Sequence, residues 1–186
     1  MMIVRTLLVV LLLSALSACS MLAPKYTPAV ANISQLKMAK IGPVAVGKVT
    51  PDSALQGNND SIGLRGSSMY SPYGSYAAYL EEALKAEFQS AGLLDMASNV
   101  LIGSTLIKND VSVGGFSTGD AIIEAKVQVK RGGSITYDKI KTATLQFESS
   151  FAGAVAIPKG RDMYPIAVQK FIEQLLADSD FMAALK

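Results

Sequence analysis

The sequence predicts an α+β domain in which one mostly antiparallel sheet of four or five strands carries two amphipathic helices on one face. Apolar residues recur at helical spacing in residues 76–91 and again in residues 162–175. Between these stretches, residues 121–131 alternate apolar and polar side chains, with Ile122 as the exception, as in a strand with one buried face. The expected order is therefore strand, short second strand, helix, three strands and helix.

The first 18 residues have the pattern of a lipoprotein signal peptide. Arg5 precedes the apolar run TLLVVLLL, which is too short to span a bilayer but fits the apolar core of a signal peptide. The tetrad at residues 16–19, LSAC, then resembles a lipobox, in which the cysteine thiol receives a diacylglycerol. We expect Cys19 to become the lipid-carrying N-terminus; the alternative is an ordinary secretory signal with an incidental cysteine.

The residues after Cys19 predict a destination and a tether. In Gram-negative sorting an Asp after the lipidated cysteine favours the inner membrane, so Ser20 implies the outer membrane, on its periplasmic face. Residues 19–40 contain Pro24 and Pro28 and lack a clean period, as expected for a lipidated tether. The alternative is that residues 30–40 pack on the domain. The expected division is thus 1–18 signal peptide, 19–40 tether and 41–186 a single α+β domain.

The domain is expected to begin with one strand, a second short strand and a helix. Residues 41–49 are rich in β-branched side chains, which favours a strand. Residues 61–66 are expected to form a short second strand, because the connection to the helix would otherwise be an unusually long loop. Ser75 suits a helix N-cap, and Gly92 suits the position after the helix end. The apolar face between them is Tyr76, Leu80, Ala83, Leu84 and Phe88.

Three strands are expected next, over residues 100–113, 121–131 and 135–151. A three-residue loop at 132–134 pairs Val129 with Tyr137, which places the apolar faces of both strands on the same side of the sheet. The change of pattern at residues 139–141 suggests a β-bulge. Asp162 then caps a final helix with Pro165 in its first turn, and residues 149–161 are expected to form a loop beneath it. The alternative is that this apolar segment, which has few charges, contacts lipid or a partner subunit.

Composition excludes several kinds of chemistry. There is no His and only one Cys, so Ser-His-Asp and Cys-His catalysis are excluded and the commonest metal ligand is missing. The chain from Cys19 onward carries 16 basic and 15 acidic residues without a basic cluster, which makes nucleic acid an unexpected partner. We expect no cofactor, no metal and no enzymatic activity.

Several aromatic residues and one arginine are candidate contacts with a ligand or partner. Tyr70, Tyr73, Tyr76 and Tyr79 recur at every third residue, and Arg65 precedes them, so this series suggests a patch for glycan or lipid. Phe116 lies in the glycine-rich segment 114–119 and is a second candidate. The alternatives are that these tyrosines pack in or over the core, and that residues 114–119 are a plain connection.

The order of elements resembles that of known envelope lipoproteins. A lipobox, a short tether, a strand, the helix YLEEALKAEFQSAGLL, a strand meander and a final helix are similar to the YajG-type lipoproteins. The same architecture occurs in the lipopolysaccharide-assembly lipoprotein LptE and in auxiliary lipoproteins of ABC-type transport systems. The resemblance implies a non-enzymatic accessory or structural subunit of an envelope assembly or transport system, with an envelope protein as partner. The alternative is a glycan- or lipid-binding module of the periplasm.

Overall fold

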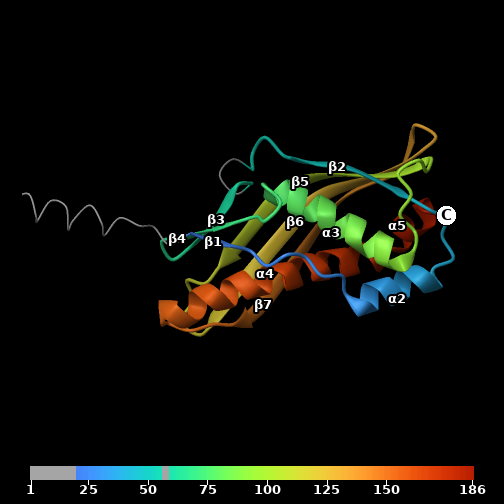
Figure 1. Cartoon of the computed structure of the whole chain (residues 1–186). Coiled ribbons are helices and arrows are strands. Elements are labelled where there is room, and N and C mark those ends of the chain that lie inside the picture. Colours follow the sequence, from blue (N-terminus) through green and yellow to red (C-terminus); the bar gives the residue numbers. More distant parts are fainter. Residues whose placement is uncertain (1–19, 56–58) are drawn as a thin grey trace, which may run out of the picture.

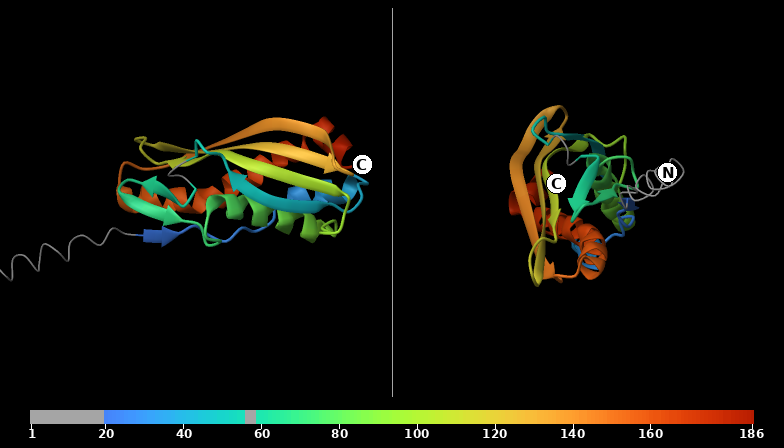
Figure 2. Two further views of the ribbon diagram at one scale, coloured as in Figure 1. Left: turned by 90° about the horizontal axis from the view of Figure 1, so that it is seen from above. Right: turned by 90° about the vertical axis from the view of Figure 1, so that its left-hand side faces the viewer.

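The computed structural model of the chain describes residues 20–55 and 59–186, and it confirms the α+β class. The predicted signal peptide and Cys19 lie outside the described residues. The structure holds two sheets rather than one, and helices α3 and α4 lie on one side of the larger sheet (Figures 1 and 2). The second sheet and two further helices were not expected, and they shape both ends of the molecule.

The larger sheet has the order β2-β5-β6-β7. Strands β5 (Val100–Ser112), β6 (Thr118–Arg131) and β7 (Ser134–Glu148) form an antiparallel meander, as predicted. Strand β2 (Ala45–Pro51) pairs with β5 in parallel, so this sheet is mixed. The parallel pairing follows from the chain path, because the helix between β2 and β5 returns the chain to the same end of the sheet.

The smaller sheet has the order β1-β4-β3. Strand β3 (Ser61–Leu64) was predicted, whereas β4 (Ser67–Tyr70) and β1 (Ser20–Leu22) were not. Arg65 and Gly66 form the turn between β3 and β4, and both have positive φ angles, 47° and 82°. Two such residues give a tight turn whose twist matches that of the flanking strands.

The two large helices pack on the apolar face of the larger sheet. Helix α3 (Tyr76–Ala91) has the predicted ends, since the Ser75 hydroxyl accepts a hydrogen bond from the Ala78 N–H and Gly92 adopts a left-handed conformation. The alternating side chains of β6 face these helices, and the buried members are Ala121, Ile123, Ala125, Val127 and Val129. The periodicities in the sequence therefore correspond to the core.

Helix α4 (Gly153–Leu176) begins earlier than predicted, so the expected loop over residues 149–161 is wrong for most of its length. Pro158 and Gly160 both lie inside the helix. Gly160 has a packing role: a Cβ atom there would lie 2.6 Å from Cγ1 of Val113. Close packing on the end of the larger sheet outweighs the low helix propensity of these residues.

The β6–β7 hairpin corrects the predicted turn but keeps the predicted register. Gly132 and Gly133, both with positive φ, form a two-residue turn, and Arg131 pairs with Ser134. The register then shifts between Val129 and Lys130, so that Val129 pairs with Tyr137 as expected. The bulge thus lies beside the turn rather than at residues 139–141, and it restores the match of apolar faces that a two-residue turn alone would destroy.

From Ser20 onward, the residues expected as a tether are part of the folded domain. Strand β1 pairs with β4, and helix α2 (Val30–Met38) packs against α3 and α4. Tyr26 and Leu36 are buried in the main core. The short helix α5 (Ser179–Ala184) follows α4. Among the described residues, no helix is both long and apolar enough to cross a membrane.

Candidate functional site

The molecule has two ends of different character. Strand β1, the β3–β4 turn, the connection between β5 and β6 and the start of α4 lie together at one end, which we call the β1 end (Figures 1 and 2). The β6–β7 turn and α5 lie at the other end, which we call the hairpin end (Figure 1). The predicted contact residues Arg65 and Phe116 belong to the β1 end, so the candidate site is described there first.

Arg65 ties the loops of the β1 end together. Its side chain reaches from the β3–β4 turn and donates hydrogen bonds to backbone carbonyls of two other connections. Nε donates to Val113 at 2.7 Å, and Nη2 donates to Gly115 and Ser150 at 3.0 Å each. Nη1 donates to Phe151. The guanidinium group, proposed from the sequence as a ligand contact, therefore forms its hydrogen bonds with the protein's own backbone.

Phe116 and Phe151 form an exposed aromatic pair beside these hydrogen bonds. Their ring centroids are 5.1 Å apart with an interplanar angle of 30°, although 35 residues of chain separate them. Phe116 is 78% exposed and Phe151 is 70% exposed. Phe116 was a candidate from the sequence; Phe151 was not named individually, but it lies in the segment 149–161, whose alternative interpretation was contact with lipid or a partner subunit. Nothing in the sequence brings residues 116 and 151 together.

The tyrosine series is divided by the fold. Tyr76 and Tyr79 are buried in α3, and their hydroxyls donate to the carbonyls of Met69 and Pro24, at 2.8 Å each. Burial raises the pKa of both phenols. Tyr73 is partly buried with its ring edge-on to Tyr79, and its hydroxyl accepts the N–H of Tyr26. Tyr70 is the member left exposed, beside Leu22 on the neighbouring strand.

A buried carboxylate holds the N-terminal segment in place. Glu87 on α3 is fully buried, and its Oε1 accepts hydrogen bonds from the Tyr26 hydroxyl at 2.5 Å, the Ala29 N–H at 3.0 Å and the Asn32 amide at 3.1 Å. Burial and the Glu87 carboxylate together raise the pKa of Tyr26. Glu87 was not predicted as a functional residue, although its position three residues after Leu84 places it on the apolar face of the helix.

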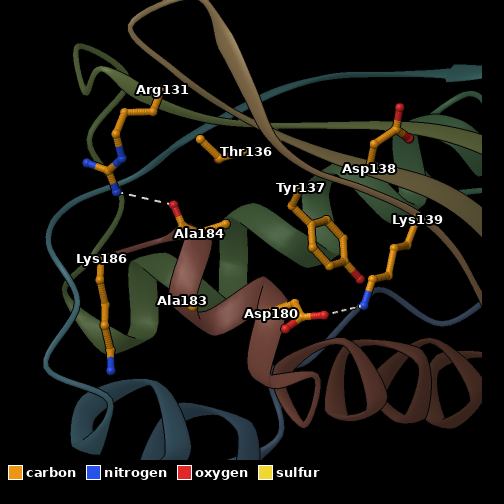
Figure 3. A pocket seen from close by; sticks show the side chains of 9 residues that line it. All are labelled: Arg131, Thr136, Tyr137, Asp138, Lys139, Asp180, Ala183, Ala184 and Lys186. Carbon is orange, nitrogen blue, oxygen red and sulfur yellow. Dashed lines mark hydrogen bonds and ion pairs between the residues drawn. The ribbon is translucent and has the colours of Figure 1, made fainter.

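An open pocket of about 540 Å³ lies at the hairpin end (Figure 3). Arg131 and Lys186 line one side of it, while Lys139 and Asp180 form an ion pair at 2.7 Å on the other. Arg131 donates to the carbonyl of Ala184 at 3.2 Å. These charges are largely satisfied within the chain, so the pocket has no convergent set of free polar groups.

Asp178 organises the charges next to this pocket. Its Oδ2 accepts the Tyr137 hydroxyl at 3.0 Å and pairs with Lys141 at 3.1 Å, while Oδ1 caps α5 through the backbone N–H groups of Asp180 and Phe181. Burial opposes ionisation of this carboxyl, but these hydrogen bonds outweigh burial and hold its pKa well below the usual range. Burial and the hydrogen bond to Asp178 raise the pKa of Tyr137.

The described side chains suggest no metal chemistry. In residues 20–55 and 59–186, no group of three or more His, Cys, Asp or Glu side chains is close enough to hold a metal ion.

Comparison with known proteins identifies relatives in fold. No family model matches the chain, and no curated protein matches it in sequence. The crystal structure of protein XCC0632 from Xanthomonas campestris, described with the family model DUF330, aligns with a TM-score of 0.55 and 12% identity. The alignment covers 88% of this chain and 96% of that one.

Two further structures extend this comparison. An uncharacterized protein aligns with a TM-score of 0.51 and 11% identity, over 85% of this chain and 94% of that one. A minor lipoprotein from Acinetobacter baumannii aligns with a TM-score of 0.42 and 11% identity over 75% of this chain and 92% of that one, which is too low to show a shared fold. At these identities the first two similarities concern the fold alone: this chain has the fold of XCC0632.

Proposed function

We propose that the protein is a bacterial lipoprotein, held on the periplasmic face of the outer membrane by acyl chains on Cys19. We further propose that it is a non-enzymatic accessory or structural subunit of an envelope assembly or transport system. The observation that carries the proposal is the LSAC tetrad at residues 16–19, directly before Ser20, where β1 begins. Several acyl chains on one residue give stable anchoring, whereas a single chain gives only marginal binding.

The surface of the domain supports a role in contact. The side chains that could have formed a polar site are used internally: Arg65 on carbonyls, Glu87 on the N-terminal segment and Asp178 on α5. Beside the Arg65 hydrogen bonds, the exposed side chains Phe116 and Phe151 are apolar. Exposed apolar groups of this kind are typical of surfaces that meet a partner or a membrane.

Removal of the thiol tests the anchor. We expect Cys19→Ala to leave the protein soluble or unprocessed, because the acceptor of the diacylglycerol is lost. Fractionation after a salt wash and the mass of the N-terminal peptide measure the effect. The matched variant Ser20→Asp retains the cysteine and should keep the acyl chains while moving the protein to the inner membrane. Membrane association of Cys19→Ala after the salt wash would contradict the anchor.

The accessory role has its own test. Purification of the intact lipoprotein in mild detergent should retain an envelope protein partner in a fixed ratio. A strictly solitary protein would contradict this part of the proposal and leave the anchor unaffected.

A glycan- or lipid-binding module is the second candidate, and one observation favours it: Tyr70 is exposed beside Leu22 on the smaller sheet. The double variant Tyr70→Ala, Tyr73→Ala should then lose binding to peptidoglycan or lipid in a pull-down assay. Unchanged binding would remove these residues from consideration.

A further inference from the structure

The exposed phenylalanines lie in two segments without charge. Residues 113–119 and 149–157 contain no Asp, Glu, Lys or Arg. Phe116 and Phe151 are exposed there, and Val155 on the first turn of α4 is exposed as well. Three exposed apolar side chains in uncharged segments would gain free energy by leaving water.

The backbone of these segments is suited to an apolar environment. Unpaired backbone carbonyls oppose entry into lipid because nothing there can replace their hydrogen bonds to water. At the β1 end, Arg65 donates to four such carbonyls, and the Ser149 N–H donates to the Ser117 carbonyl at 2.9 Å. Arg65 binds the backbone of both segments beside the aromatic pair, so its charge would lie at the phosphate level of a membrane that these rings enter.

The position of this surface relative to Cys19 indicates that a membrane contacts it. In the register of β1 with β4, Ser20 lies beside Ser68. Arg65 is three residues before Ser68, a distance of about 10 Å along a strand. Since Cys19 directly precedes Ser20, a lipid on Cys19 starts at the same end of the molecule as the phenylalanine pair.

We infer that Phe116 and Phe151, with Val155 beside them, insert into the headgroup region of the membrane that holds the lipid anchor. This inference rests on the proposed lipidation of Cys19. The anchor makes insertion an intramolecular event, so a small apolar surface suffices. The domain is then oriented with its β1 end on the bilayer and its hairpin end towards the periplasm. The absence of charge in both segments favours the lipid phase over a protein partner selected by complementary charge.

Tryptophan reporters test this orientation, because the chain contains no Trp. Phe116→Trp and Phe151→Trp place a single indole at the β1 end. Ile135→Trp is the matched control, since Ile135 is also exposed, at 52%, but lies beside the β6–β7 turn at the hairpin end. The full lipidated chain is reconstituted in phosphatidylethanolamine–phosphatidylcholine vesicles with and without brominated acyl chains, and Trp emission is recorded.

The expected result is a blue shift and loss of most emission at positions 116 and 151 in brominated vesicles, with neither effect at position 135. Equal quenching at all three positions, or none at any, would overturn the inference. A blue shift at 116 that depends on protein concentration but not on brominated lipid would also overturn it and indicate a second copy of the chain as occupant. The mass of the N-terminal peptide from the same preparation reports the acyl chains separately, so failure of the anchor and failure of the docking surface are distinguishable.

Discussion

The two ends of the molecule hold their loops with opposite chemistry. At the β1 end a single cation, Arg65, donates to neutral carbonyls, and the surface beyond it is aromatic and uncharged. At the hairpin end a single carboxylate, Asp178, accepts from Tyr137, Lys141 and the start of α5, and the surface beyond it carries charges of both signs. The contrast indicates that the β1 end suits a low-dielectric neighbour, whereas the hairpin end is built for water.

Removal of Asp178 should have the larger effect on stability. Asp178→Ala deletes the cap of α5 and leaves the Tyr137 hydroxyl and Lys141 without their acceptor. We expect a loss of about 2–3 kcal/mol in the free energy of unfolding, measured with urea. Asp178→Asn is the matched control, because it retains one oxygen for the cap but loses the charge and the second oxygen, which accepts from Tyr137 and Lys141. If Asp178→Ala lost less free energy of unfolding than Asp178→Asn, the hydrogen bonds and ion pair of Asp178 would be shown to contribute little to stability.

The same carboxylate predicts acid sensitivity. Its pKa is lowered in the folded state, so the stability that it supplies is complete above its unfolded pKa of about 4 and is lost as the pH falls towards the folded pKa. The wild-type chain should therefore lose more stability than Asp178→Asn when the pH falls below about 4. Melting temperatures of both chains across this range measure the difference. Parallel curves would contradict the assigned role.

Removal of Arg65 should reduce stability less than removal of Asp178 does. Its effect on structure should be confined to the loops that Arg65 binds. Arg65 is exposed, so solvent replaces part of what its hydrogen bonds provide, and we expect Arg65→Met to cost about 1–2 kcal/mol. Residues 113–117 and 149–152 should become the preferred sites of limited proteolysis. Arg65→Lys separates charge from geometry, because an ammonium cannot serve four carbonyls as the guanidinium does. Unchanged cleavage in both variants would show that these loops keep their conformation without the Arg65 hydrogen bonds.

Elements defined by a local pattern could be predicted from the sequence, whereas contacts between distant residues could not. Helix α3 and strand β6 follow from periodicity within about fifteen residues, and both are observed as predicted. The site at the β1 end depends on contacts across long stretches of chain, such as Arg65 with Phe151, and no local pattern carries them. The start of α4 was missed for the same reason, since Gly160 packs closely against Val113, which directly follows the distant strand β5.

The placement of residues 20–38 has a consequence for the order of folding. Ser20 pairs with Ser68, Asn32 donates to the Gln169 carbonyl, and Gln35 donates to the Leu176 carbonyl. The N-terminal segment of the domain is therefore completed by contacts with its C-terminal helix, and contacts at such sequence separation form slowly. If the chain is exported as proposed, residues 20–38 have no partner until residues 169–176 follow them, so the segment after Cys19 would complete its folding late.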